Sequence, residues 1–260
     1  MRDTGILATD SVARRVNRES FLLLGGTAAL LMQIAHPLVA AGVDQHSDFR
    51  RAPLGRLLRT LNTTLAIVFS DSPRAKSAMA RINRRHVGVR GLSRTGARYD
   101  ARDPALLLWV QCTLVLTSLR LYELVMGRLS SDEREEYWKE AKLIAAGLGL
   151  PRKAAPRTFA DLERYESEML RTVVVPDDTS RAAARDVLRP FGWIPGPLWW
   201  PLDALTAGLL PAKIRSALGL RFHTPERLFF RASIVGVRMI LPLVPRSLRL
   251  VPQARRAGSR

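Results

Sequence analysis

Residues 103–127 read DPALLLWVQCTLVLTSLRLYELVMG, and this run is apolar on nearly every side of a helix. Asp103 is a residue type that caps helix N-termini, and Pro104 suits the first helical position, so the pair predicts where the helix begins. A helix that is apolar all round is stable only when other elements cover it. We therefore expect this helix to lie at the centre of the fold.

Upstream of it, FLLLGGTAALLMQIAHPLVAAGV (residues 21–43) predicts a second buried helix. Ser20 is the expected N-cap, and the helix is expected to run to about Ala41. Pro37 lies inside this helix, where it bends the axis and leaves the carbonyl of Gln33 without its usual N–H donor.

Helix signals recur along the rest of the chain. Most of the predicted helices begin with a capping residue, a proline or an acidic residue in the first turn. Most of them end at a glycine or a proline. The expected helices are Pro53–Phe69, one opened by Ser72-Pro73 and ending at Gly88–Gly91, one opened by Ser130-Ser131-Asp132-Glu133 and ending at Gly147 or Gly149, Thr158–Val175, and Pro225–Leu241. We find no strand alternation and no internal repeat, so the predicted fold class is all-α.

The composition is that of a globular protein. Of 260 residues, 47 % are hydrophobic and 25 % are charged, which does not favour disorder. The length is sufficient for one sizeable core. We expect an N-terminal extension over residues 1–19, a single helical domain over 20–252 and a basic tail over 253–260.

The net charge of +18 is high. Such a charge attracts phosphate backbones, anionic membrane surfaces and acidic ligands. The arginines are spread along the chain, and the sequence has no zinc-finger spacing, RNA-binding signature or continuous basic helix. A specific nucleic-acid partner is therefore not expected, and the oligomeric state is left open.

The sequence favours a cytoplasmic protein. Residues 21–43 are uncharged and long enough to span a bilayer, but Gly25-Gly26, Gln33 and His36-Pro37 suit a protein core better than lipid. The lone Cys112 lies in an apolar run, as expected in a reducing compartment. Residues 190–214, PFGWIPGPLWWPLDALTAGLLPAKI, predict either a helical lid or a surface for lipid and apolar ligands, so peripheral contact with a membrane is also expected.

His86 stands out among the polar residues. It continues a stripe with Ala75, Met79 and Ile82, while Arg81, Arg84 and Arg85 face away from that stripe. Its position fits either a core histidine or a ligand. One imidazole cannot complete a zinc site, and the sequence has no HxxxH, HExxH or CxxC motif. Haem needs only one protein ligand, so a single helical histidine suffices there.

Other polar groups leave alternatives open. Arg56, Thr60 and Thr64 (or Thr63) share one helix face, which is either a solvated face or part of a site. Arg120 and Glu123 are predicted to form a buried ion pair. His36 and His46 with Asp44 and Asp48 could supply a non-haem iron site, although the paired ExxH arrangement of di-iron bundles is missing.

Four segments together resemble a known family. They are LLLGGTAALLMQIAHPLVAAGVDQHSDFRRAPLGRLLRTL, RINRRHVGVRG, DPALLLWVQCTLVLTSLRLYE and GLLPAKIRSALGL. The AHP, HSDF, RxxRT and HxxVRG elements, in this order, resemble the catalytic domain shared by the fungal oxygenase MpaB and the bacterial rubber oxygenases, or latex-clearing proteins. The resemblance extends from about Arg15 to Pro252.

The resemblance implies an all-helical, globin-like protein that binds haem b and uses dioxygen as a co-substrate. It implies that His86 is the proximal iron ligand, and that Arg56 and Thr60 are the catalytic arginine and threonine beside the haem. Arg59 stands where rubber oxygenases have a lysine, and an arginine ligates iron poorly because it stays protonated. Gln111 and Cys112 stand where the family has a histidine and a small residue, and Gln111 cannot shuttle protons near neutral pH.

We therefore expect a haem-dependent oxygenase, an oxidoreductase, that acts on a hydrophobic, isoprenoid or lipid-like small molecule. His86 would hold the iron, Arg56 would orient a propionate or polarise dioxygen, and Thr60 would donate a hydrogen bond. The alternative is a haem- or lipid-binding protein without catalysis that associates peripherally with a membrane.

Overall fold

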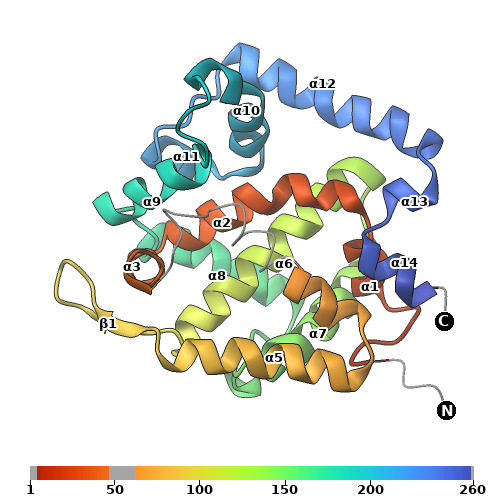
Figure 1. The fold of residues 1–260 in the computed structure, drawn as a ribbon, viewed down its shortest axis with the longest axis horizontal. Coiled ribbons are helices and arrows are strands. Elements are labelled where there is room, and N and C mark those ends of the chain that lie inside the picture. Colours follow the sequence, from red (N-terminus) through yellow and green to blue (C-terminus); the bar gives the residue numbers. More distant parts are fainter. Residues whose placement is uncertain (1–4, 47–61, 259–260) are drawn as a thin grey trace.

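Helix α6, Pro104–Met126, runs through the middle of the computed structural model, which describes residues 5–46 and 62–258 (Figure 1). Its start is the predicted one, since the Asp103 carboxylate accepts the backbone N–H of Ala105 at 2.8 Å and Pro104 occupies the first turn. Trp109 and Cys112 have no exposed surface. The predicted central helix is confirmed.

The helices that pack against α6 come from both halves of the chain. They are α1 (Val12–Asn17), the 3-10 helix η1 (Ser20–Gly25), α2 (Gly26–Ile34), α7 (Ser131–Gly147), η3 (Arg152–Ala154), α8 (Phe159–Thr172), α10 (Trp200–Leu209) and α12 (Thr224–Ile240). The N-terminal extension therefore contributes a helix to this packing.

The other described elements lie around this group. They are α3 (Pro37–His46), a helical segment over residues 62–69, α5 (Ser72–Val87), the strands β1 (Arg90–Leu92) and β2 (Arg98–Asp100), α9 (Asp178–Leu188), η4 (Gly196–Trp199), α11 (Ala212–Ala217), η5 (Leu241–Leu243), α13 (Arg246–Arg249) and α14 (Pro252–Gly258). Helices α10, α11 and α12 lie on one side of the molecule and α5 lies on the opposite side (Figure 1). The all-α class is confirmed.

The buried side chains form two large clusters, and α6 contributes to both. One joins α1, residues 62–69, α6 and α7, and contains Leu116 and Trp138. The other joins α2, α9 and α11, and contains Trp109 from α6. Since α6 supplies side chains to both clusters, it connects the two halves of the core.

The chain turns sharply at Pro37. The predicted single helix from Ser20 to Ala41 is wrong, because the segment consists of η1, α2 and α3, and the axis bends by 106° between Ile34 and Pro37. Proline cannot donate an N–H to the preceding turn, so the helix ends there and a new one begins in another direction. Ser20 does not cap a helix, and its hydroxyl donates instead to the carbonyl of Leu248 at 3.2 Å.

The carbonyls at this break are satisfied by α6. The indole N–H of Trp109 lies 3.2 Å from the carbonyl oxygen of Met32 and 3.3 Å from that of Gln33. The Gln33 carbonyl, which the Pro37 nitrogen cannot reach with an N–H, accepts the backbone N–H of His36 at 3.2 Å as well as the indole of Trp109, 76 positions away. A buried carbonyl without a donor is costly, so this contact fixes α2 against α6.

Local capping groups start the later helices, and those of α7 and α8 are the predicted ones. In α5 the cap is Asp71, which accepts the N–H of Arg74, so Pro73 is the second helical residue and not the first as predicted. Ser130 with Glu133, and Thr158 with Asp161, form reciprocal capping boxes at the starts of α7 and α8. Helix α12 covers the predicted Pro225–Leu241 segment to within one residue at each end.

Arg120 and Glu123 do not form the predicted ion pair with each other. Arg120 Nη1 donates to Glu166 Oε1 of α8 at 2.9 Å, and Glu123 accepts two hydrogen bonds from Arg134 of α7 at 2.6 and 2.8 Å. The two α6 side chains point toward different neighbouring helices, and each finds an opposite charge there. The ion pairs therefore join α6 to α7 and α8.

Strands β1 and β2, which the sequence reading missed, form an antiparallel hairpin that pairs Arg90 with Asp100 and Leu92 with Arg98. Three residues per strand are too few to show a period of two. The hairpin projects beyond the helices at one edge of the molecule (Figure 1).

Helix α6 is also long and apolar enough to cross a membrane. It has 23 residues, and 67 % of its most apolar window is buried inside the fold. The η1–α2 and α3 pair passes the same test only as a bent span. Burial by α2, α7 and α8 accounts for the apolar surface of α6 without lipid.

Replacing Trp109 by Phe should destabilise the fold by about 1–3 kcal/mol, because the buried Met32 carbonyl loses the indole N–H. The Gln33 carbonyl still accepts the backbone N–H of His36 in the variant. Trp199→Phe is the matched control, since the buried indole nitrogen of Trp199 has no hydrogen-bond partner within the described residues. Chemical denaturation of both variants measures the difference. Equal losses would show that ring volume, and not the N–H group, matters at Trp109.

Candidate functional site

His86 lies in the last turn of α5. The predicted stripe is present, since Ala75 and Met79 are buried and Ile82 and His86 are half-buried. Met79 fits against α7 at Gly147, where a Cβ would lie 2.3 Å from the Met79 sulfur. Asn83 donates to the Gly147 carbonyl at 3.0 Å. These contacts fix the rotation of α5 and hold His86 on its inward-facing side.

Burial keeps the His86 imidazole neutral. It lowers the pKa of His86 below the usual 6.5, and the nearby Asp100 carboxylate opposes this shift only in part. Within residues 5–46 and 62–258, neither ring nitrogen makes a hydrogen bond. A neutral, half-buried imidazole with an unused lone pair is a suitable metal ligand.

The end of α3 is bonded to the hairpin that follows His86. His46 Nε2 lies 3.2 Å from the carbonyl oxygen of Arg90 and 3.1 Å from the Tyr99 hydroxyl. Gln45 donates to the carbonyl of Leu92 at 2.8 Å and accepts the Tyr99 hydroxyl at 2.7 Å. The HSDF and HxxVRG motifs, 40 residues apart in sequence, are therefore in direct contact through His46 and Arg90.

Gly91 permits this contact. A Cβ at Gly91 would lie 2.9 Å from the Tyr99 hydroxyl and 3.0 Å from Gln45 Oε1, so any side chain would push these groups apart. Sequence reasoning identified His46 but missed Gln45 and Tyr99. Gly91 in the HxxVRG motif was the one available signal, because a glycine between polar residues often marks a close approach of backbone to side chain.

His36 has a local role at the helix break. It is 6 % exposed, and its Nδ1 accepts the backbone N–H of Leu38 at 3.2 Å. Desolvation lowers the pKa of His36, while its own backbone and Asp103 act in the opposite direction. The neutral ring thus satisfies an orphan N–H in the first turn of α3.

The proposed non-haem iron set is only partly testable. His36 and His46 stand at opposite ends of α3, about 15 Å apart along a helix of this length, so one ion cannot take both as ligands. Among the described residues, no three His, Cys, Asp or Glu side chains are placed to share a metal ion. Asp48 lies outside the described residues.

Arg56, Thr60 and Arg59 also lie outside the described residues, so the predicted arginine and threonine of the site have no structural placement here. The helical segment that follows them, residues 62–69, is held by α1. Arg14 Nε donates to the carbonyl of Val68 at 3.0 Å, and Ile67 and Val68 are buried.

Gln111 is directed toward α7, where its amide donates to the carbonyl of Ala141 at 3.4 Å. Cys112 is fully buried, and burial raises its pKa well above the usual value, so it packs as a small apolar group.

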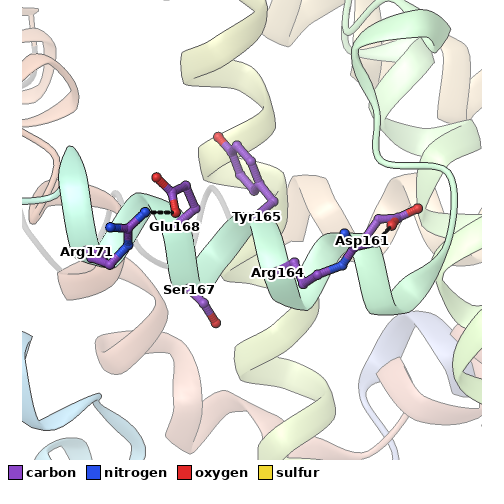
Figure 2. A pocket seen from close by; sticks show the side chains of 6 residues that line it. All are labelled: Asp161, Arg164, Tyr165, Ser167, Glu168 and Arg171. Atoms are coloured by element: carbon purple, nitrogen blue, oxygen red, sulfur yellow. Dashed lines mark hydrogen bonds and ion pairs between the residues drawn. The ribbon is translucent and has the colours of Figure 1, made fainter.

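One open hollow lies along α8. Figure 2 shows its lining, which comes from that helix alone: Asp161, Arg164, Tyr165, Ser167, Glu168 and Arg171. Arg164 pairs with Asp161, and Arg171 pairs with Glu168 at 2.6 Å. The charges are thus paired within one exposed helix face, and the hollow does not include any residue predicted for the site.

Comparison with known proteins identifies the family of this chain. Residues 13–239 match the family described as "ER-bound oxygenase mpaB/B'/Rubber oxygenase, catalytic domain". The chain belongs to this family of oxygenase catalytic domains. It is also similar to two mycobacterial proteins, "Uncharacterized protein Rv2237" of Mycobacterium tuberculosis and "Uncharacterized protein Mb2261" of Mycobacterium bovis. Each is 25 % identical over 232 residues, covering 84 % of this chain and 88 % of the relative.

Gly91→Ala should destabilise the protein by about 1–3 kcal/mol, because the new methyl group overlaps the Tyr99 hydroxyl and Gln45. Gly88→Ala is the matched control, since a Cβ at Gly88 meets nothing within 4 Å. Adding Tyr99→Phe to the Gly91 variant removes the overlapping oxygen and should restore part of the stability in denaturant titrations. Full additivity of the two changes would contradict the predicted overlap.

The stability of the protein should fall as the pH drops from about 7 to about 5. His36 and His86 have lowered pKa values in the fold, so below the unfolded pKa the unfolded chain binds more protons than the folded one. His36→Asn retains an acceptor for the Leu38 N–H but does not titrate. Urea titrations at several pH values should give a shallower pH dependence for this variant, and an unchanged slope would contradict the role of His36.

Proposed function

We propose that this protein is a haem b-dependent oxygenase that uses dioxygen to oxidise a hydrophobic, isoprenoid or lipid-like substrate. The observation that carries the proposal is His86, a neutral, half-buried imidazole without a hydrogen-bond partner in the described part of the chain, in a member of an oxygenase family. Family membership is stated above, and the proposal adds the cofactor and the substrate class to it.

The donor set fits haem better than a bare metal ion. A bare iron or zinc ion needs three or more protein ligands, and the described residues offer no such group. Haem carries four ring nitrogens of its own and needs one protein ligand. His86 supplies that ligand at the end of a helix whose rotation is fixed by Met79 and Asn83.

The hairpin adds a second contribution. His46 and Gln45 bind β1 and Tyr99, so hydrogen bonds hold the end of α3 against the hairpin that follows α5. The chain then leads directly from His46 into the segment that contains Arg56 and Thr60. We propose that this connection brings Arg56 and Thr60 beside the group held by His86.

Haem iron, when bound, supplies the reduction and activation of dioxygen. In our proposal His86 holds the iron and, being neutral at pH 7, does so without first losing a proton. Arg56 pairs with a propionate, and Thr60 donates a hydrogen bond in the pocket. Arg59 stays protonated, so it would not serve as an iron ligand if haem were bound.

Aromatic side chains support an apolar substrate. The ring of Phe191 lies 6.0 Å from that of Trp193 and 6.3 Å from that of Trp199, and Trp193 is 80 % exposed. The segment identified from sequence as a lid or an apolar surface therefore forms an aromatic cluster in contact with solvent. We propose that this cluster collects hydrophobic substrate for the site.

A haem-binding protein without catalysis is the second candidate, and Gln111 favours it. The family resemblance predicts a histidine at this position, whereas Gln111 cannot carry a proton and its amide contacts α7. Oxygen consumption by the haem-loaded protein with an unsaturated isoprenoid separates the two candidates. Haem binding without oxygen consumption across a panel of such substrates would favour the second.

The haem proposal predicts a Soret band in the purified or haem-reconstituted protein. His86→Ala should lower haem affinity by at least the 10–100-fold that loss of an outer-shell partner costs. His223→Ala, a change at an exposed histidine at the start of α12, is the matched control and should bind haem normally. In the His86→Gly protein, added imidazole should restore the spectrum.

Two results would overturn parts of the proposal. A protein that shows no Soret band after reconstitution would exclude haem as the cofactor. Full haem affinity in His86→Ala, with a folded structure by circular dichroism, would instead exclude His86 as the ligand while leaving haem binding in place.

A further inference from the structure

Helix α12 is apolar on two opposite faces. Its inner face packs against α10 and α6 through half-buried residues such as Phe230 and Val237, and Phe230 lies so close to Gly208 that a Cβ there would overlap its ring. Its outer face carries Leu228, Val235 and Met239 at helical spacing, with Met239 71 % exposed. The inner face accounts for the packing of the helix, whereas the outer face is exposed in the described part of the chain.

The exposed apolar residues continue beyond α12. Leu243 of η5 is 81 % exposed and Leu248 of α13 is 71 % exposed. The Ser20 hydroxyl donates to the carbonyl of Leu248, which places this end beside η1, where Leu23 and Leu24 are also exposed. These exposed apolar residues are together called the α12 surface: Leu228, Val235, Met239, Ile240, Leu243 and Leu248. Helix α12 forms a border of the molecule (Figure 1).

Arginines line one flank of this apolar stripe. Arg227, Arg231 and Arg238 are exposed and follow each other at spacings of four and seven. Residues 224–260 contain eight arginines and one acidic residue, Glu226. That carboxylate is buried, where it accepts the His223 backbone N–H at 2.8 Å and the Trp200 indole N–H at 3.0 Å. The surface charge here is therefore entirely positive.

The charges indicate which occupant fits. Neither Arg231 nor Arg246 has a carboxylate partner within residues 5–46 and 62–258. A second copy docked on the same surface would bring two arginine rows together, which like-charge repulsion disfavours. An anionic bilayer offers phosphates for the guanidinium groups and an acyl boundary for the apolar stripe, and long arginine side chains reach the phosphates while their stems lie along the apolar surface.

We propose that the α12 surface binds the face of an anionic membrane. Leu228, Val235 and Met239 enter the boundary between headgroups and acyl chains, and Arg231 and Arg246 contact lipid phosphates. The helix lies in the plane of the interface, because three arginines on 17 residues do not suit a membrane span. This binding does not depend on the cofactor, so it is measured separately from the haem proposal.

Flotation of the purified protein with vesicles tests the proposal. Binding is expected to vesicles of phosphatidylcholine mixed with phosphatidylglycerol, to be weaker with phosphatidylcholine alone, and to fall as salt is added. The triple variant Leu228→Ser, Val235→Ser, Met239→Ser should lose about tenfold or more of its binding to the mixed vesicles. Leu92→Ser, Leu143→Ser, Val175→Ser, a triple change at exposed apolar residues elsewhere, is the matched control and should bind normally.

A charge variant keeps the test decisive if the triple variant fails to fold. Arg231→Gln with Arg246→Gln should lose binding on the order of tenfold, whereas Arg94→Gln with Arg152→Gln, which removes the same charge from two other exposed positions, should not. Equal binding by the two pairs would overturn the proposal, as would equal binding to both vesicle types. A stable dimer that the triple serine change dissociates would also overturn it, because the surface would then join two copies of the chain.

Discussion

The indole N–H of Trp109 is the contact on which the arrangement of this fold depends. Pro37 ends α2 and turns the chain by 106°. The backbone N–H of His36 donates to the Gln33 carbonyl, so the Met32 carbonyl does not receive that N–H, its usual helical donor. A buried carbonyl must find a donor, and Trp109 of α6 supplies one. Because α6 also contributes to both large clusters of buried side chains, the direction of α3 is set relative to the whole core.

The position of α3 helps to fix the position of His86 at the C-terminal end of α5. Gln45 and His46, at the far end of α3, bind the hairpin that follows His86. The rotation of α5 is fixed separately at Gly147, through Met79 and Asn83. His86 is therefore held from two sides, with its ring half-buried and neutral. This arrangement follows from side-chain packing and hydrogen bonds to the backbone.

The distribution of positive charge on the surface follows from which arginines have acidic partners. Many arginines pair with acidic residues between helices, as Arg120 does with Glu166 and Arg134 with Glu123. Those of α12 and α13 have few such partners, because the last 37 residues contain a single carboxylate that is used inside the protein. The excess charge thus gathers beside the exposed apolar residues of the same segment. An oxygenase that takes up lipid-like substrate would benefit from a surface of this composition.

The sequence by itself determined the helices whose starts are local. Asp103 with Pro104 and the capping boxes of α7 and α8 involve neighbouring residues, and the N–H groups of a first helical turn need acceptors in any fold. The stripe that contains His86 could also be predicted, because it depends only on the spacing of residues along one helix. Only the tertiary structure decided the partners of Arg120 and Glu123, the hairpin contacts of His46, and the indole donor for the Met32 carbonyl. Each of these joins groups far apart in sequence, so its geometry depends on how whole helices pack.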